Sequence, residues 1–322
     1  MDRRIPTLVL LAFAAASPAV LAQDHHHQYK VPRTEFDHPD FQGNWSTAFL
    51  TTLERPAGVE TLVATPEQAE ALVAGIRKMM PAVVDPDVQI HDLKHLALVK
   101  GEYRTSMIVD PPDGRIPFTQ AGLELAARVK ARDAQFDNPE ERPLQERCLE
   151  GIGDAPIRTV PVVLPYQIVQ TRDYVVIFSE GPAGLRTIPL NHQAPPAEIR
   201  SIAGYSAGHW EGDTLVVRTT NLRADNPARG VIGRALVISR ATTIVERFTR
   251  VSDTELFYQF TVEDPDLYTQ PWTGEFSLTR FDGQLFEYAC HEGNYSLANI
   301  LRGGRAEEAR RAESKQVQRT NP

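Results

Sequence analysis

The sequence lacks the short motifs that identify several large enzyme classes. It has no glycine-rich phosphate loop, no Gly-x-Ser-x-Gly elbow and no Cys-x-x-Cys pair. These absences argue against a P-loop nucleotide enzyme, a common serine hydrolase and a thioredoxin-like oxidoreductase. We therefore expect a protein that works without a cofactor.

Positive charge is also in short supply. The 322 residues contain 34 lysines and arginines against 42 aspartates and glutamates, a formal net charge of −8. Nucleic-acid binders need a basic face for the phosphates, so this balance argues against that class, although it permits a local cationic pocket. The length allows one large domain or two ordinary ones, and the hydrophobic fraction of 42% supports a sizeable core.

Long hydrophobic runs are confined to the N-terminus. Arg3 and Arg4 precede an apolar stretch over residues 8–20, and Ala22 ends a small-residue cleavage site. The apolar stretch is too short for a convincing membrane span and has the layout of a signal peptide. We predict that residues 1–22 are removed and that the mature protein is periplasmic or secreted, with no membrane span.

Cysteine occurs only twice, at Cys148 and Cys290. In an exported chain two cysteines indicate one disulfide, and the alternative is a pair of buried free thiols. We predict a bridge between them.

Strand patterns dominate the second half of the chain. Residues 214–220 are β-branched at most positions, and Glu211-Gly212-Asp213 has the composition of a tight turn, so the flanking segments form a hairpin. Similar short segments with short turns on both sides are typical of an antiparallel meander or barrel. The predicted strands cover residues 166–171, 174–180, 185–190, 203–210, 214–221, 236–251, 255–263, 273–280 and 284–291, with an isolated one over 103–109.

Gly43-Asn44-Trp45 resembles the opening signature of lipocalin-like barrels, although a core tryptophan in any strand explains it equally well. We predict a mainly β protein: an antiparallel curved sheet or barrel, lipocalin/calycin-like, with peripheral helices.

Thr65 and Thr119 cap the two predicted helices, over 65–80 and 119–135. The predicted organisation is a flexible tail over 23–40, a single β-rich domain over 41–295 with a helical insert around 65–150, and a charged helical tail over 296–322.

Polar residues suited to acid–base chemistry gather near the ends of the predicted strands. His291 and Glu292 end the last strand, but adjacent strand residues point to opposite faces, so their alternative role is to satisfy loop backbone. By the same alternation either Glu246 or Arg247 points inward, but not both. The candidate catalytic residues are His291, Glu292, Glu246 and Asp213. The candidate substrate-binding residues are Arg247, Trp210, Tyr258, Trp272 and Tyr288.

His91 and His95 have the i, i+4 spacing that binds zinc on a helix. They supply two of the three or four ligands that zinc requires, and no third ligand is evident. We predict no metal site.

Several segments taken together resemble one family of uncharacterised exported bacterial proteins, common in proteobacteria and acidobacteria. The similarity covers residues 41–45 and most of 115–295. The resemblance implies the β-rich fold, export and the cysteine pair, and it names no reaction. Relatives carry an aspartate where Arg218 stands and a histidine-rich loop where residues 230–235 stand. The segments that carry the resemblance are residues 147–149, 166–171, 208–217, 246–248, 262–265, 268–273 and 287–294, including the Trp-Glu-Gly-Asp-Thr-Leu-Val-Val motif.

Three functions fit these observations, and we expect the first, with the second as the alternative. The first is an exported, cofactor-independent enzyme, such as a lyase, dehydratase, isomerase or hydrolase, acting on a small and partly apolar molecule. The second is a non-catalytic binding or carrier protein that uses the same cavity. The third is a structural envelope protein. An enzyme should pair titratable groups with shifted pKa values inside one pocket, whereas a carrier pocket should be mainly apolar.

Overall fold

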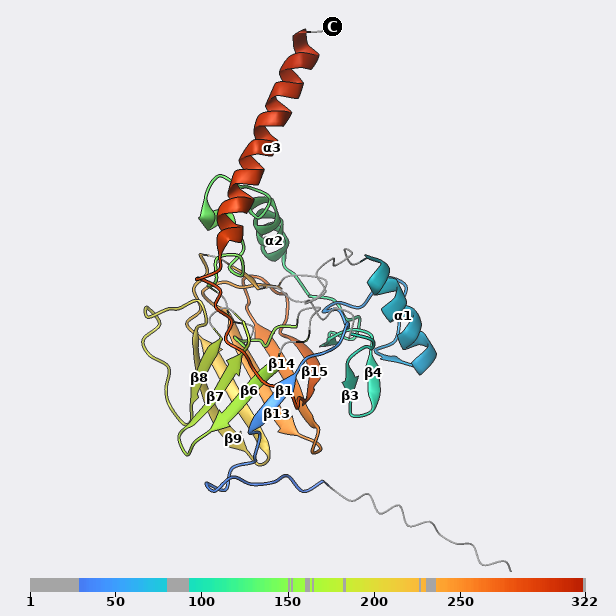
Figure 1. Cartoon of the computed structure of the whole chain (residues 1–322). Coiled ribbons are helices and arrows are strands. Elements are labelled where there is room, and N and C mark those ends of the chain that lie inside the picture. Colours follow the sequence, from blue (N-terminus) through green and yellow to red (C-terminus); the bar gives the residue numbers. More distant parts are fainter. Residues whose placement is uncertain are drawn as a thin grey trace, which may run out of the picture. The chain divides into compact units, whose positions relative to one another are not determined.

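A ten-stranded antiparallel sheet forms the centre of the computed structural model (Figure 1). The model describes residues 29–320 except for residues 80–92, 150, 152, 160–162, 164, 182–183, 226 and 230–235. The chain from Val31 onward forms one unit, and only this unit is considered below. The predicted signal peptide and His91 lie outside the described residues.

The sheet follows a simple order, with β8 and β9 at its two edges. The nine strands of the path are β8 (Leu185–Pro189), β7 (Tyr174–Ser179), β6 (Pro165–Gln170), β1 (Gly43–Ser46), β15 (Trp272–Arg280), β14 (Glu255–Glu263), β13 (Thr243–Arg250), β10 (Thr214–Thr220) and β9 (Tyr205–Glu211). The tenth strand, β5 (Ile108–Asp110), also pairs with β15. The prediction of a mainly β protein with an antiparallel sheet is therefore confirmed.

The two edges of the sheet approach one another without a ladder between them. In the described part of the chain, β8 and β9 are linked by one parallel bridge, between Leu190 and Gly208. A Cβ atom on Gly208 would lie 3.0 Å from the Ile188 side chain, so the small residue permits this approach. The sheet is not closed, and the predicted lipocalin-like barrel is not confirmed.

Buried and more exposed side chains alternate along most of β13 and along β14, as the sequence predicted. In β14, Leu256, Tyr258, Phe260 and Val262 are all buried, and in β13 Glu246 is buried while Arg247 is exposed on the other face. The β9–β10 hairpin turns at Gly212, whose φ of 60° suits glycine. These strands obey the two-residue period because one face packs inward and the other meets water.

Among the described residues, three α-helices and two small sheets lie outside the large sheet, and the C-terminal helix projects away from it (Figure 1). Thr65 and Gln68 form the predicted capping box of α1 (Pro66–Met79), and Thr119 caps α2 (Gln120–Arg132). The predicted C-terminal helix is α3 (Tyr295–Thr320), and a short 3-10 helix, η2, spans Pro139–Glu141. The small sheets comprise β2 (Val63–Ala64), β4 (Glu102–Arg104) and β3 (Leu98–Val99), and β11 (Ala228–Arg229) with β12 (Leu236–Val237).

The predicted strand over residues 284–291 is wrong. This segment has no strand pairing and leaves Phe286 and Tyr288 exposed. Both sides of β15, the preceding strand, already have partners in β14, β1 and β5, so no position beside it is open. Two other predicted strands are each split in two. Residues 236–251 divide into β12 and β13, and residues 103–109 divide into β4 and β5.

Candidate functional site

A buried ion pair lies inside the sheet, between Glu246 of β13 and Arg186 of β8. The Glu246 and Arg186 side chains are 0% and 4% exposed, and two guanidinium nitrogens donate to the two carboxylate oxygens. The Tyr258 hydroxyl donates to Glu246 Oε1 at 2.8 Å and accepts the Ile157 amide at 2.9 Å. Burial, together with the charge of Glu246, raises the pKa of Tyr258 well above its usual value, so the phenol stays protonated.

Arg186 also binds two strands at the opposite edge of the sheet from β8. Its Nε donates to Ser206 of β9 and its Nη2 to Thr219 of β10, each at 3.0 Å. One guanidinium thus joins β8 to β9, β10 and β13. The buried Arg186 charge favours this arrangement of the strands. An arrangement that moved β9, β10 or β13 away would leave the guanidinium buried without its partners.

A second buried cluster of charges continues from the first. Arg158 donates to the Gly151 carbonyl at 2.8 Å, and Arg229 donates to the Ile202 carbonyl at 2.9 Å. Asp154 accepts the Gly151 amide at 2.9 Å and lies in the field of three arginines. Burial raises the pKa of the Asp154 carboxyl, against the lowering effect of that amide and of the arginines.

Of the predicted site residues, the structure brings together Glu246 and Tyr258. Asp213 pairs with Arg33 at the surface, and Arg247 pairs with Glu211 at 2.8 Å on the outer face. These two ion pairs belong to the exposed side of the sheet, so they do not share an environment with Glu246.

Of the remaining predicted residues, Trp272 belongs to the same apolar core as Tyr258 and Trp210 packs against that core, whereas the others lie elsewhere. Trp210 stacks on His38 with ring centroids 5.4 Å apart, and Trp272 is completely buried in the core. His291 and Glu292 belong to the turn before α3, and Tyr288 is 53% exposed. The positions of Tyr288, His291 and Glu292 follow from the absence of the predicted strand over residues 284–291.

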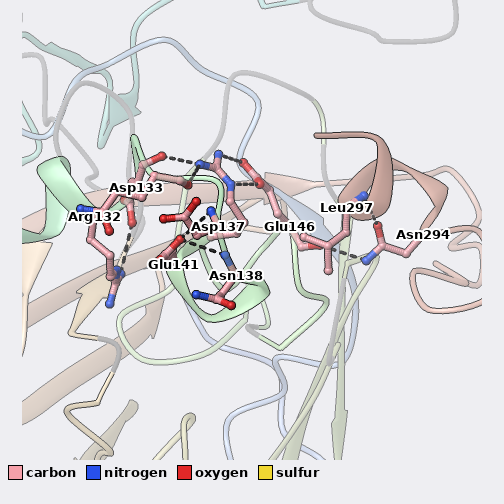
Figure 2. A network of polar contacts seen from close by, with 10 residues as sticks. Arg132, Asp133, Asp137, Asn138, Glu141, Glu146, Asn294 and Leu297 are labelled. Atoms are coloured by element: carbon pink, nitrogen blue, oxygen red, sulfur yellow. Dashed lines mark hydrogen bonds and ion pairs between the residues drawn. The ribbon is translucent and has the colours of Figure 1, made fainter. Parts of the chain in front are cut away.

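The predicted disulfide is present. Cys148 and Cys290 are bonded, with Cα atoms 5.8 Å apart and a separation of 142 positions in sequence. Asn294 strengthens this junction, because its side chain donates to the Glu146 carbonyl at 2.9 Å and accepts the Leu297 amide at the start of α3 (Figure 2). The loop before Cys148 is therefore tied to the beginning of the C-terminal helix.

A cavity of about 440 Å³ opens beside this loop. We call it the basic groove, and its lining combines an apolar part with charged groups. The apolar residues are Leu144, Leu149 and Ile202, and the charged ones are Glu140, Arg147, Arg223 and Asp225.

Three segments far apart in sequence build the basic groove. The Leu149 amide closes the loop on the Leu144 carbonyl at 3.0 Å, and Arg147 lies inside that loop, next to the disulfide. Ile202 and Arg223 come together because the Arg223 amide donates to the Ser201 carbonyl at 2.8 Å. The groove wall is also held from within, since Arg229 binds the Ile202 carbonyl.

The arginines of the groove differ in how they are neutralised. Arg223 binds both carboxylate oxygens of Asp225, and this hydrogen bonding lowers the pKa of Asp225, with a smaller contribution from Arg147. Within the part of the chain that the structure describes, the half-buried Arg147 side chain forms no hydrogen bond or ion pair. An anionic group entering the groove would therefore meet a guanidinium with its donors available.

Metal binding depends on residues that are only partly described. His95 Nδ1 lies 3.0 Å from the Leu96 carbonyl, whereas His91 is outside the described residues. Among the residues with a described position, no group of three or more His, Cys, Asp or Glu side chains is placed to hold an ion. Within the same residues, no helix is both long and apolar enough to cross a membrane.

Sequence reasoning missed the buried partner of Glu246 and the residues of the basic groove. Arg186 carried a usable signal, since it alternates with Leu185 and Thr187 in a predicted strand, and so takes the inward register of Ile188. The arginines of the groove lie in loops. Loops have no regular period, so the sequence does not indicate which way their side chains point.

Comparisons with family models, with curated proteins and with solved structures find no match for this chain. The resemblance to exported bacterial proteins therefore stays a prediction.

Proposed function

We propose that this protein is a non-catalytic binding or carrier protein for a small, partly apolar molecule with an anionic group. The basic groove is the binding site. The observation that carries the proposal is Arg147, whose guanidinium forms no hydrogen bond or ion pair with the described residues and lies beside the apolar lining of Leu144, Leu149 and Ile202. The groove is concave and joins an apolar side to charged groups that can orient a ligand, two features of small-molecule sites.

Binding is favoured over acid–base catalysis by the state of the titratable groups. Glu246, the buried candidate base, is engaged by Arg186 and Tyr258. A general base needs to reach the proton that it abstracts, and Glu246 is 0% exposed. Catalysis by the predicted residues remains the alternative function.

Export of the mature chain is part of the proposal. It is supported by the disulfide between Cys148 and Cys290, because disulfides persist mainly in oxidising compartments. A lipocalin-like wrapping of the sheet is likewise proposed, on the support of the bridge between Leu190 and Gly208.

The test is a thermal-shift screen of amphipathic monocarboxylates with the purified protein. A ligand that binds the native state raises the melting temperature, by an amount that grows with ligand concentration over Kd. Arg147→Gln should weaken binding about tenfold, as expected for loss of one charge-assisted hydrogen bond. The matched control is Arg128→Gln, at an exposed arginine on α2. The proposal fails if no carboxylate raises the melting temperature, or if Arg147→Gln responds like the wild type.

A further inference from the structure

A second hollow adjoins the basic groove and shares two of its residues. Arg223 and Asp225 line both, so the two hollows meet at the Arg223–Asp225 ion pair. We call this second hollow, of about 390 Å³, the outer basin. The residues that line it are Glu198, Arg200, Arg223, Ala224, Asp225 and Arg240.

Arg200 is fixed in the outer basin without being neutralised. Its Nη1 donates to the Leu222 carbonyl at 3.1 Å and to the Arg240 carbonyl at 3.0 Å. These carbonyls hold the guanidinium in place but carry no net charge, so its positive charge persists and its other nitrogens keep their donors. The site is preorganised for an anion, because little side-chain freedom remains to be lost on binding.

Arg240 adds a second cation beside Arg200. Its side chain is exposed and makes no hydrogen bond or ion pair within the described portion of the chain. Among the residues with a described position, the groove and the basin together are lined by four arginines and three carboxylates, namely Arg147, Arg200, Arg223 and Arg240 against Glu140, Glu198 and Asp225. Since Arg223 and Asp225 neutralise each other, the remaining cations are Arg147 on one side of their pair and Arg200 with Arg240 on the other.

We propose that the ligand carries two carboxylates, one at each end of a short apolar chain. One carboxylate pairs with Arg147 in the basic groove and the other with Arg200 and Arg240 in the outer basin. The apolar chain lies along the Leu144, Leu149 and Ile202 side of the groove. A planar carboxylate matches the guanidinium fork, and its single charge suits hollows where a glutamate opposes the arginines better than a doubly charged phosphate does. This inference rests on the proposed binding function and names its ligand class.

The experiment compares two ligand series by calorimetric titration at low salt. The dicarboxylates are adipate, suberate and sebacate, and the monocarboxylates of matching length are hexanoate, octanoate and decanoate. The variants are Arg240→Gln, which removes a cation with no structural partner in the described chain, and Arg128→Gln as the control. We expect the best dicarboxylate to bind about tenfold more tightly than its monocarboxylate, the factor for one added charge-assisted contact. Arg240→Gln should reduce this preference, because only Arg200 then remains for the second carboxylate, whereas Arg128→Gln should leave the preference unchanged.

The outcomes separate this inference from the function on which it rests. If monocarboxylates and dicarboxylates bind equally and Arg240→Gln changes neither, the two-carboxylate ligand is refuted while the binding function stands. If neither series binds, both are refuted. If Arg128→Gln reduces the preference as much as Arg240→Gln, the effect is one of overall charge and the outer basin is not the site.

Discussion

Glu246 and Arg186, which are 60 residues apart in sequence, form an ion pair in the interior of the sheet. Arg186 lies on the edge strand β8, and Glu246 lies on β13, two strands in from the opposite edge. The pair therefore spans the opening between the two edges, where the described chain has only one bridge of backbone pairing. The pair has a structural role, which is to hold the two edges of the sheet together. This role is independent of the proposed binding function.

Removing one member of this pair should destabilise the protein strongly. Glu246→Gln leaves the Arg186 charge buried without its counter-charge, which typically lowers the free energy of unfolding by about 3–5 kcal/mol. Urea unfolding followed by circular dichroism measures the change.

The control for the pair is the double variant Arg186→Met with Glu246→Leu. It removes both charges and should recover much of the lost stability, because well-packed apolar residues often replace a buried ion pair at little cost. A double variant less stable than Glu246→Gln would contradict the role assigned to the pair.

Asp154 should make stability fall as the pH rises. Burial raises its pKa in the folded state above the unfolded value of about 3.9. Between these two pKa values the native state binds more protons than the unfolded state, so the free energy of unfolding decreases with rising pH. The decrease begins near the unfolded value and is complete above the folded pKa.

The measurement is urea unfolding of the wild type and Asp154→Asn across the acidic range. The asparagine does not titrate, so the difference between the two proteins isolates Asp154. The wild type should lose stability relative to the variant as the pH rises. The opposite trend would mean that Arg158, Arg186 and Arg229 outweigh burial and lower the pKa.

Asn221 should be essential for the geometry around Arg200 and Ile202. Its φ is 57°, and its amide nitrogen lies within 3.2 Å of three carbonyl oxygens, those of Pro195, Pro196 and Ile199. Asn221→Asp keeps the size of the side chain but places acceptors against those carbonyls. We expect a loss of at least about 1–3 kcal/mol, the cost of leaving buried polar groups unpaired.

Asn221→Gly is the comparison for this position. Glycine tolerates the positive φ and introduces no repulsion, so it should destabilise less than aspartate. Thermal unfolding of the three proteins gives the order of stability. If the aspartate and glycine variants have the same melting temperature, the Asn221 side-chain amide does not hold the loop that contains Pro195, Pro196 and Ile199.

The disulfide should be detectable chemically and should contribute to stability. In the denatured protein, alkylation without reductant should modify neither cysteine, and alkylation after reduction should modify both. Loss of a native disulfide typically costs about 2–5 kcal/mol. Melting curves of the wild type and the Cys148→Ser, Cys290→Ser double variant measure this cost, and two alkylated thiols in the unreduced sample would contradict the bridge.

Local features of the sequence predicted much of the fold. The capping residues Thr65 and Thr119, the turn at Gly212 and the alternation around Tyr258 were all interpreted correctly. Each depends on residues a few positions apart. The strand predicted over residues 284–291 did not form, because both sides of β15 are already paired with other strands.

The sequence by itself determined the β-rich class, the position of the helices, which residues share a face in the central strands and the pairing of its only two cysteines. Only the tertiary structure decided that Glu246 is neutralised by Arg186 and that Arg147, Ile202 and Arg223 line one cavity. The physical reason is range. Caps, turns and alternation are set by neighbouring residues, whereas an ion pair or a groove depends on which distant segments the packed core brings together.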